Sequence, residues 1–305
     1  MPFRRLLQYR PGPHGSSARN PAVGDRWIAA MRHMLGAGIV AALLLQFSNV
    51  ALAGTTLDRV LTNKTVVVAV EPGYPPFSFL NQQNQMDGFD VDVAKAFADR
   101  LGVTLVVDTP SCDLVNAGDW RGRWDICVCS MTPDRRKAKV LDFVVPYYQS
   151  PVVVVTTAAN NLLKSTSDIS GRRIGVEHGS TYERYLQHDL SLSVPDSPRI
   201  AYPFGRVRIV PFGSEDLAYQ ALALGAGKRL DAVVSSLATA KYRTDKLPGK
   251  FRIVGQPLYA EPNWISVDKG DREWQEKIRA IIGELKADGT LARISRKWLA
   301  EDFTR

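Results

Sequence analysis

Residues 65–102 constrain the fold of this chain more than any other stretch. They begin with a run of β-branched and small residues, 65–70, of the kind that forms a buried strand. Pro75 and Pro76 follow, and two adjacent prolines cannot continue a β-ladder, so the strand must end in a loop of fixed, non-helical backbone. This loop places the aromatic ring of Tyr74 just beyond the end of a strand.

A helix is predicted after the polar turn that follows, with its start at Gly88-Phe89-Asp90. Asp90 is a favoured N-cap residue, and Asp92 lies in the first turn, where the helix dipole stabilises negative charge. Apolar residues then recur at helical spacing, and Gly102 is suited to the C-cap. The whole stretch is therefore predicted to form a strand, an aromatic loop and a helix.

Strands and helices continue to alternate along the chain, which predicts a mostly parallel α/β sheet. Strands are predicted at 103–107, 125–129, 140–145, 152–155, 173–177, 208–210, 231–235, 251–254 and 264–267. Helices are predicted at 112–118, 134–139, 182–187, 214–224, 237–244, 272–287 and 291–298. The stretches 149–152 and 258–262 are predicted to carry the chain from one αβ lobe to a second lobe and back.

The positive charge of the chain is concentrated in its first 53 residues. The formal net charge is +8, and residues 1–53 hold six arginines, a single acid (Asp25) and no lysine. The remainder is therefore only weakly basic, which argues against a nucleic-acid partner.

The same leader has the organisation of a secretory signal peptide. Basic residues precede an apolar run, 34–45, and Ala51-Leu52-Ala53 forms a small-x-small cleavage site. A transmembrane anchor is the alternative, but the apolar run is short of the ~20 residues that a span needs. We expect export to the periplasm with cleavage before Gly54, and Met31 is a candidate for the true start.

Three cysteines follow the leader, so at least one thiol has no intrachain partner. Cys127 and Cys129 are expected on one face of a strand, too far apart to bridge comfortably, which leaves a bridge from Cys112 to either of them. A Cys-x-Cys sequence in a chain with four histidines makes a poor metal site, and no metal or cofactor is expected.

The chain resembles the family 3 periplasmic solute-binding proteins, which deliver amino acids and related polar solutes to ABC importers. The resemblance covers 62–302 and combines the aromatic loop Tyr74–Phe77 with the helix entry Gly88–Asp92. Further segments fit in order and spacing: Trp124-Asp125-Ile126, Ser130-Met131-Thr132-Pro133, Lys139-Val140-Leu141-Asp142-Phe143, Gly179-Ser180-Thr181, Leu230-Asp231-Ala232-Val233 and Lys286–Leu291.

The resemblance implies an α/β, two-lobed periplasmic binding protein fold of type II, with two crossovers between the lobes and hinge closure on a ligand. It places 54–150 with 261–305 in the first lobe and 151–260 in the second, after the leader 1–53. It further implies an amino acid or small carboxylate as ligand, an inner-membrane ABC permease as partner, and a monomer that is not an enzyme.

The resemblance also assigns binding roles to individual positions. Tyr74 matches an aromatic residue that covers the ligand, and Glu71 matches an acid that faces the side chain of cationic amino acids. Ser130 and Thr132 match residues that meet the ligand's carboxylate and ammonium groups, and Thr181 matches a carboxylate donor of the second lobe.

Other binding positions depart from the family pattern. Lys137, with Arg135 and Arg136 next to it, replaces a carboxylate-clamping arginine and offers a point charge instead of a bidentate fork. The remaining departures are Ser236 in place of an acid that holds the α-ammonium group, Cys112 in place of a second aromatic wall, and Cys129 in place of a small pocket residue. Because Cys112 and Cys129 both fall on pocket positions, we predict a disulfide between them.

The missing ammonium-binding acid changes the expected ligand. We predict a small organic anion or an atypical amino acid, unless Glu71, Glu177 or Glu261 supplies the missing charge. An enzyme on the same scaffold, similar to the dehydratases of cyclohexadienyl acids, is the alternative, with Glu71 and Glu177 as candidate general acids. A sensor or cell-wall enzyme that carries this domain as a module is disfavoured, because the last family helix lies close to Arg305.

Overall fold

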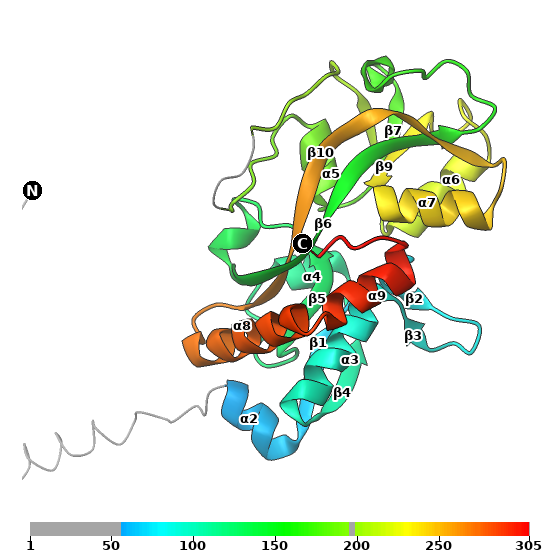
Figure 1. Cartoon of the computed structure of the whole chain (residues 1–305). Coiled ribbons are helices and arrows are strands. Elements are labelled where there is room, and N and C mark those ends of the chain that lie inside the picture. The colour runs from blue at the N-terminus through cyan, green and yellow to red at the C-terminus, as the bar shows by residue number, and fades with distance from the viewer. Residues whose placement is uncertain (1–55, 195–198, 305) are drawn as a thin grey trace, which may run out of the picture. The chain divides into compact units, whose positions relative to one another are not determined.

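The computed structural model describes residues 56–194 and 199–304 (Figure 1). The predicted signal peptide and its cleavage site lie outside these residues. Residues 54–305 form one compact unit. In the part of the chain that is described, no helix is long and apolar enough to span a bilayer.

Within the described residues, eight strands form one mixed sheet in the order β4-β1-β5-β10-β6-β9-β7-β8. In one half of the sheet β1 pairs in parallel with β4 and β5, and in the other half β7 pairs in parallel with β8 and β9. A two-stranded hairpin, β2 with β3, stands apart from this sheet. The strands are β1 (Thr65–Ala69), β2 (Phe79–Leu80), β3 (Met86–Asp87), β4 (Thr104–Asp108), β5 (Ile126–Met131), β6 (Leu141–Thr157), β7 (Arg173–Glu177), β8 (Arg208–Phe212), β9 (Ala232–Ser236) and β10 (Phe251–Asp268).

The long strands β6 and β10 run side by side, antiparallel, through both halves of the sheet (Figure 1). The sequence predicted each of them as two separate strands. The two predicted crossover segments instead pair with each other inside these strands, with Gln149 opposite Pro262 and Val152 opposite Tyr259. The prediction of separate strands was wrong because Pro151 and Pro262 each remove a single ladder donor, and the neighbouring pairs continue the ladder.

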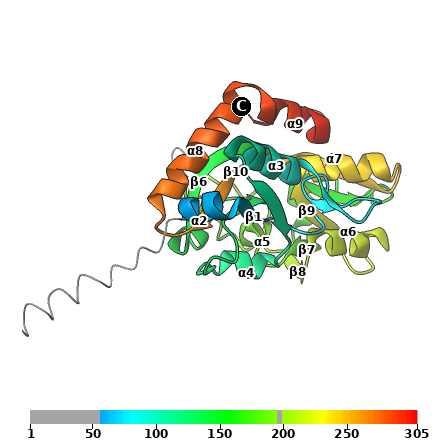
Figure 2. The ribbon, with the colours of Figure 1, turned by 90° about the horizontal axis from the view of Figure 1, so that it is seen from below.

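Helices cover both faces of the sheet. Figure 2 shows α3, α8 and α9 on one side of β1 and α4 on the other. A hydrophobic cluster joins Phe97 of α3, Ile126 of β5, Ile281 of α8 and Leu291 of α9, while Val115 of α4 belongs to a separate cluster on the opposite face. The helices are α2 (Thr56–Asn63), α3 (Phe89–Leu101), α4 (Cys112–Asn116), α5 (Thr181–Leu186), α6 (Glu215–Ala223), α7 (Leu237–Lys246), α8 (Arg272–Ala287) and α9 (Thr290–Leu299), with 3-10 turns at Lys137–Lys139 and Thr166–Ile169. The helix predicted at 134–139 is therefore only a short 3-10 turn.

The predicted N-cap role of Asp90 is wrong. Gly88 is the N-cap of α3, with φ of +127°, and a Cβ at this position would collide with the carbonyl oxygen of Phe77. Asp90 instead lies fully buried in the first turn, where Ser130 Oγ donates to its carboxyl group at 2.7 Å and Tyr147 OH donates at 2.8 Å. Burial raises the pKa of Asp90 to about 8. Because the main-chain N–H of Ser130 also donates to the Tyr147 hydroxyl at 2.8 Å, this network ties the end of β5 to α3.

The predicted disulfide between Cys112 and Cys129 is also wrong. Cys129 is bonded to Cys127, and Cys112 is a free thiol. The Cα atoms of Cys127 and Cys129 lie 5.5 Å apart, closer than the ~6.6 Å that two residues of a regular strand would span. The strand is irregular at this point, because Ser130 has a φ of +52° and the register between β5 and β10 shifts. This irregularity brings the two thiols of the Cys-x-Cys sequence within bonding distance.

The buried network around Tyr147 can be tested by Tyr147→Phe. The variant leaves Asp90 and the Ser130 N–H each short of a hydrogen-bond partner, and an unsatisfied buried group costs about 1–3 kcal/mol. We expect the free energy of unfolding, measured by urea denaturation, to fall by about 2–4 kcal/mol. Tyr219→Phe is the matched control, because Tyr219 is equally buried but its hydroxyl has no partner among the described residues. Equal losses for the two variants would contradict this account.

Candidate functional site

A cavity lies between the two halves of the sheet and takes its walls from both. The space inside it that is open to the centre of a water-sized sphere is about 60 Å³. Its lining residues are Val70, Glu71, Tyr74, Pro110, Cys112, Val115, Cys129, Ser130, Met131, Thr132, Lys137, Glu177, Ser180, Thr181, Tyr182, Glu215 and Glu261.

The topology of the sheet explains why these residues meet. Glu71 follows β1, Pro110 follows β4, and Cys129–Met131 end β5. In the other half Glu177 ends β7, and Glu215 follows β8 as the first residue of α6. Open α/β sheets bind ligands at the carboxyl ends of their parallel strands, and here two such edges face one cavity.

The structure brings eight of the nine predicted binding residues to this cavity. They are Glu71, Tyr74, Cys112, Cys129, Ser130, Thr132, Lys137 and Thr181. Ser236 is not among the lining residues: it is the N-cap of α7, and its hydroxyl accepts the N–H of Thr239 at 3.1 Å. The hydroxyl of Ser236 is thus engaged in capping a helix, which corrects its assignment as a ligand contact.

Four glutamates dominate the electrostatics of the cavity. Burial raises the pKa values of Glu177 and Glu261, raises that of Glu215 to about 8, and raises that of Glu71 well above its usual range. Proximity to Glu177 raises the pKa of Glu71 further. Among the lining residues that the structure describes, Lys137 is the single base. The cavity therefore carries an excess of acid, which the expectation of an anionic ligand did not foresee.

The acids differ in the hydrogen bonds that the protein donates to their carboxyl oxygens. Glu261, which lies in β10, accepts a hydrogen bond from the hydroxyl of Thr181, and this contact opposes the rise of its pKa caused by burial. Glu215 Oε1 and Oε2 and Glu71 Oε1 are buried and have no hydrogen-bond partner among the described residues. Thr132 Oγ1, which also lines the cavity, is likewise buried without a partner. A buried polar atom without a partner is costly, so these atoms mark positions where a ligand would bond.

Two tyrosines close the cavity across the lobes. The hydroxyl groups of Tyr74 and Tyr182 lie 3.0 Å apart and share a hydrogen bond. Tyr74 comes from the loop after β1 and Tyr182 from α5, so one residue of each half contributes. This contact places an aromatic ring from each side over the acidic interior.

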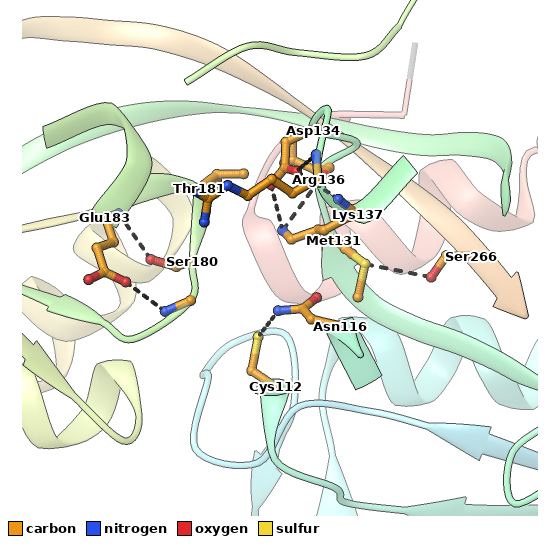
Figure 3. A network of polar contacts seen from close by, with 12 residues as sticks. Cys112, Asn116, Met131, Asp134, Arg136, Lys137, Ser180, Thr181, Glu183 and Ser266 are labelled. Atoms are coloured by element: carbon orange, nitrogen blue, oxygen red, sulfur yellow. Dashed lines mark hydrogen bonds and ion pairs between the residues drawn. The ribbon is translucent and has the colours of Figure 1, made fainter. Parts of the chain in front are cut away.

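The basic run that precedes β6 divides between the cavity and the surface. Lys137 is 7 % exposed. Its Nζ lies 3.7 Å from Asp134 Oδ2 and donates to the carbonyl oxygen of Thr132 at 3.4 Å. Asp134 also accepts the main-chain N–H groups of Arg136 and Lys137, which fixes the turn (Figure 3). Arg135 and Arg136 are exposed. Lys137 is therefore the member of this run that faces the cavity, and its charge is already offset by a carboxylate.

Cys112 lines the same cavity as a protonated thiol. Asn116 donates to its sulfur at 3.1 Å (Figure 3), and burial raises the pKa of Cys112 to about 11. The described residues contain no group of three or more side chains placed to hold a metal ion.

Sequence reasoning missed Glu215 and Tyr182 as wall residues. Both follow parallel strands of the second half, at the edge where open α/β sheets bind ligands. In the sequence, Glu215 falls within the helix predicted at 214–224. In the structure, Ser214 is the N-cap of α6 and its side chain accepts the N–H of Leu217. The burial of the first-turn acid beside the cap could not be inferred from local propensity.

Comparison with known proteins supports the family inferred from the sequence. The chain is 31% identical over 261 residues to the L-arginine-binding protein of Pseudomonas aeruginosa, covering 83% of this chain and 94% of that one. It is 26% identical over 250 residues to the L-cystine-binding protein TcyJ of Escherichia coli, covering 82% and 88%. A solved structure, the ancestral amino acid-binding protein AncCDT-1, a precursor of cyclohexadienyl dehydratase, superimposes with a TM-score of 0.69 at 28% identity over 80% of this chain and 100% of that one.

The family assignment rests on most of the chain. Residues 66–301 match the model of the bacterial extracellular solute-binding proteins, family 3. The two-lobed α/β fold and a cavity walled by both lobes are in keeping with that match. The chain belongs to the bacterial extracellular solute-binding proteins of family 3.

Proposed function

We propose that this protein is the substrate-binding receptor of an ABC importer and that its cavity binds an amino acid with a cationic side chain. The observation that carries the proposal is a set of four lining glutamates, three buried and one half-buried, against a single lining lysine whose charge Asp134 offsets. The names of the relatives, which specify arginine and cystine binding, support an amino acid as ligand.

The charge of the cavity favours a cation over the small organic anion that the sequence suggested. That expectation depended on the absence of an acid for the ligand's ammonium group at position 236. Two acids of the cavity wall replace that acid: Glu215, at the start of α6, and Glu261, in β10. An anion would have to enter next to several carboxyl groups, whereas a cation would relieve their mutual repulsion.

Hinge closure is the second part of the proposal. The main-chain N–H of Arg135 donates to Ser191 O at 3.2 Å, and that of Ser193 donates to Pro133 O at 2.9 Å. Arg136 lies 3.9 Å from Asp189. These contacts join the segment before β6 to the segment after α5, so the structure has the features of a closed form. We place the hinge where β6 and β10 pair across 149–152 and 259–262.

The remaining assignments follow from the family. We propose that the lobes comprise 54–150 with 261–305 and 151–260, supported by separate hydrophobic clusters that draw mainly on 60–148 with 265–299 and on 152–259. We further propose a periplasmic monomer that loses residues 1–53 on export and delivers its ligand to an inner-membrane permease. The organisation of the leader and the family's extracellular location support this.

We propose binding without turnover. The curated relatives compared above are named as binding proteins, whereas the solved ancestral protein is described as a precursor of a dehydratase. Glu215, buried and with a pKa raised by burial to about 8, has the properties of a general acid, so incubation with cyclohexadienyl acids tests the alternative. Formation of a dehydrated product would replace receptor function by catalysis.

Calorimetry with arginine and citrulline tests the cationic side chain, because the two ligands have nearly the same shape and differ by one charge. Loss of one partner of a buried charge pair costs about 2–5 kcal/mol. We therefore expect arginine to bind at least about 30-fold more tightly than citrulline. Glu71→Gln should reduce this preference, and Glu284→Gln, an exposed partner of Arg100, should leave it unchanged. Equal affinity for the two ligands would refute the proposal.

The acids of the cavity predict a dependence of stability on pH. Burial raises the pKa of Glu215 from 4.5 to about 8, so the folded form without ligand holds a proton that the unfolded chain releases. Stability should be highest below pH 4.5 with respect to this group and should fall as pH rises through about 8, by at most about 1.4 kcal/mol per pH unit. The pKa of Asp90 is also raised to about 8, so Asp90 contributes to the pH dependence of stability over the same pH range. Subtracting the free energy of unfolding of Glu215→Gln from that of the wild type at each pH isolates the contribution of Glu215. Denaturation curves that respond identically to pH in the two proteins would contradict this prediction.

Small-angle X-ray scattering tests closure. Without ligand, repulsion between carboxyl groups on the two walls should favour separation of the lobes, and a bound cation should favour contact. We expect the radius of gyration to decrease when saturating ligand is added. Identical scattering curves with and without a ligand that calorimetry shows to bind would argue against the hinge.

A further inference from the structure

Three segments of the second half of the sheet form a surface that lies away from the ligand cavity. They are 159–173, 223–231 and 249–252, which meet around two neighbouring surface grooves, and we name them the far surface. β7 begins on this surface, at Arg173, and reaches the cavity at its other end, at Glu177. The residues that line the ligand cavity in the described part of the chain all lie outside these three segments.

Hydrogen bonds fix the three segments to one another. Arg252 donates to the two end carbonyl oxygens of the turn 160–163, and its bond to the second of them measures 2.6 Å. Arg173 donates to the carbonyl oxygens of Gly227 at 2.7 Å and of Lys228 at 2.9 Å. The far surface is therefore a fixed arrangement of side chains, although loops make up most of it.

Two leucines of the far surface are exposed to solvent. Leu162 is 70 % exposed and Leu224 is 54 % exposed, and both line the same surface groove. The next residue, Leu163, is buried in a hydrophobic cluster, and the main-chain N–H of Leu162 donates to Asn160 Oδ1 at 3.0 Å. The turn thus holds Leu162 outside the core in a set conformation. Exposed apolar side chains that lie together mark a candidate contact with a partner.

Basic residues outnumber acids on the far surface. The three segments contain seven bases and two acids. The bases are Lys164, Arg172, Arg173, Lys228, Arg229, Lys250 and Arg252. Lys250 lines the groove that holds both leucines, and Arg172 lines the neighbouring groove together with Leu162. The exposed apolar side chains therefore lie among positive charges.

The two acids offset only part of this charge. Asp231 lies 3.6 Å from the guanidinium group of Arg173. Asp168 accepts the main-chain N–H groups of Lys164 and Ser165, both at 2.8 Å. The three lysines and Arg229 are exposed. A negatively charged partner can therefore reach several bases at once.

This combination fits the surface of a membrane better than the surface of a protein. Apolar side chains that insert at the bilayer interface act together with lysines and arginines that meet lipid phosphates. A stable protein interface needs about 800 Å² on each partner, with an apolar centre. The apolar part of the far surface consists of two leucines and a few small residues, too little for such a centre.

We propose that the far surface binds a membrane that contains anionic phospholipids, with Leu162 and Leu224 inserted at the interface and the neighbouring bases next to the lipid phosphates. The contact keeps an exported receptor close to the membrane in which its importer lies. It uses no residue that lines the ligand cavity, so ligand binding and membrane binding can be measured separately.

Sedimentation with vesicles tests the proposal on protein purified from cells that express the full chain. Vesicles of phosphatidylcholine alone are compared with vesicles that also contain phosphatidylglycerol. We expect binding to the anionic vesicles that weakens as salt is added, because salt screens the attraction between bases and phosphates. Equal binding to both kinds of vesicle, or no binding to the anionic ones, overturns the proposal.

Charge variants assign the binding to the far surface, because the N-terminal leader is common to all of them. Each base near an anionic membrane contributes about fivefold to binding, so Lys228→Gln with Arg229→Gln should weaken binding by about 25-fold. Arg272→Gln with Lys286→Gln, which removes two exposed bases of α8, is the matched control. Equal losses for the two double variants would show general charge attraction and would overturn the proposal.

A second pair of variants tests insertion of the leucines. Leu162→Ser with Leu224→Ser should weaken binding to the anionic vesicles by about tenfold, because each side chain returns to water. Leu80→Ser with Leu247→Ser, two exposed leucines of another groove, is the control and should leave binding unchanged. Equal effects of the two pairs would overturn the insertion of Leu162 and Leu224.

Two further measurements complete the test. Thermal unfolding checks that each variant folds, and Lys250→Gln, with an expected loss of about fivefold, replaces any double variant that does not. Binding to immobilised polyglutamate, lost in the far-surface charge variant and accompanied by no binding to anionic vesicles, would assign the far surface to an acidic polypeptide and overturn the membrane proposal.

Discussion

The structure depends on placing several glutamate side chains in one cavity, where the carboxyl ends of parallel strands from both halves of the sheet face each other. Glu71 follows β1 in one half of the sheet. In the other half Glu177 ends β7, and Glu215 follows β8 as the first residue of α6. The topology that makes a binding cavity therefore also brings carboxyl groups together in a region of low dielectric. Burial raises the pKa values of these groups, and protons or a cationic ligand would reduce their mutual repulsion.

The two long strands form the proposed hinge. β6 and β10 pass through both halves of the sheet and pair with each other where the lobes meet. In the proposed hinge, bending at this pair would change the distance between the walls and keep the hydrophobic clusters of each half intact. The hydrogen bonds between 133–135 and 191–193 join segments outside this strand pair.

Much of the cavity follows from sequence order. Residues after a predicted strand, such as Tyr74, Thr132 and Thr181, line it because strand ends converge in an open α/β fold. The same rule covers Glu215, which was overlooked because local propensity treats a first-turn acid as a solvated partner of the helix dipole. Ser236 shows the opposite error, since its hydroxyl is taken up by the cap of α7. Family position alone did not reveal which hydrogen bond the side chain makes.

The sequence by itself determined the alternation of strands and helices and the family, because these depend on local patterns and on the spacing of short motifs. Only the tertiary structure decided the pairing of Cys127 with Cys129, the burial of Asp90 and the satisfied state of Ser130, Thr181 and Lys137. The physical reason is that a strand irregularity, a buried hydrogen bond and an ion pair each depend on atoms brought together from distant parts of the chain. The tertiary structure also decided the excess of acid in the cavity, because that excess is the sum of side chains from both lobes.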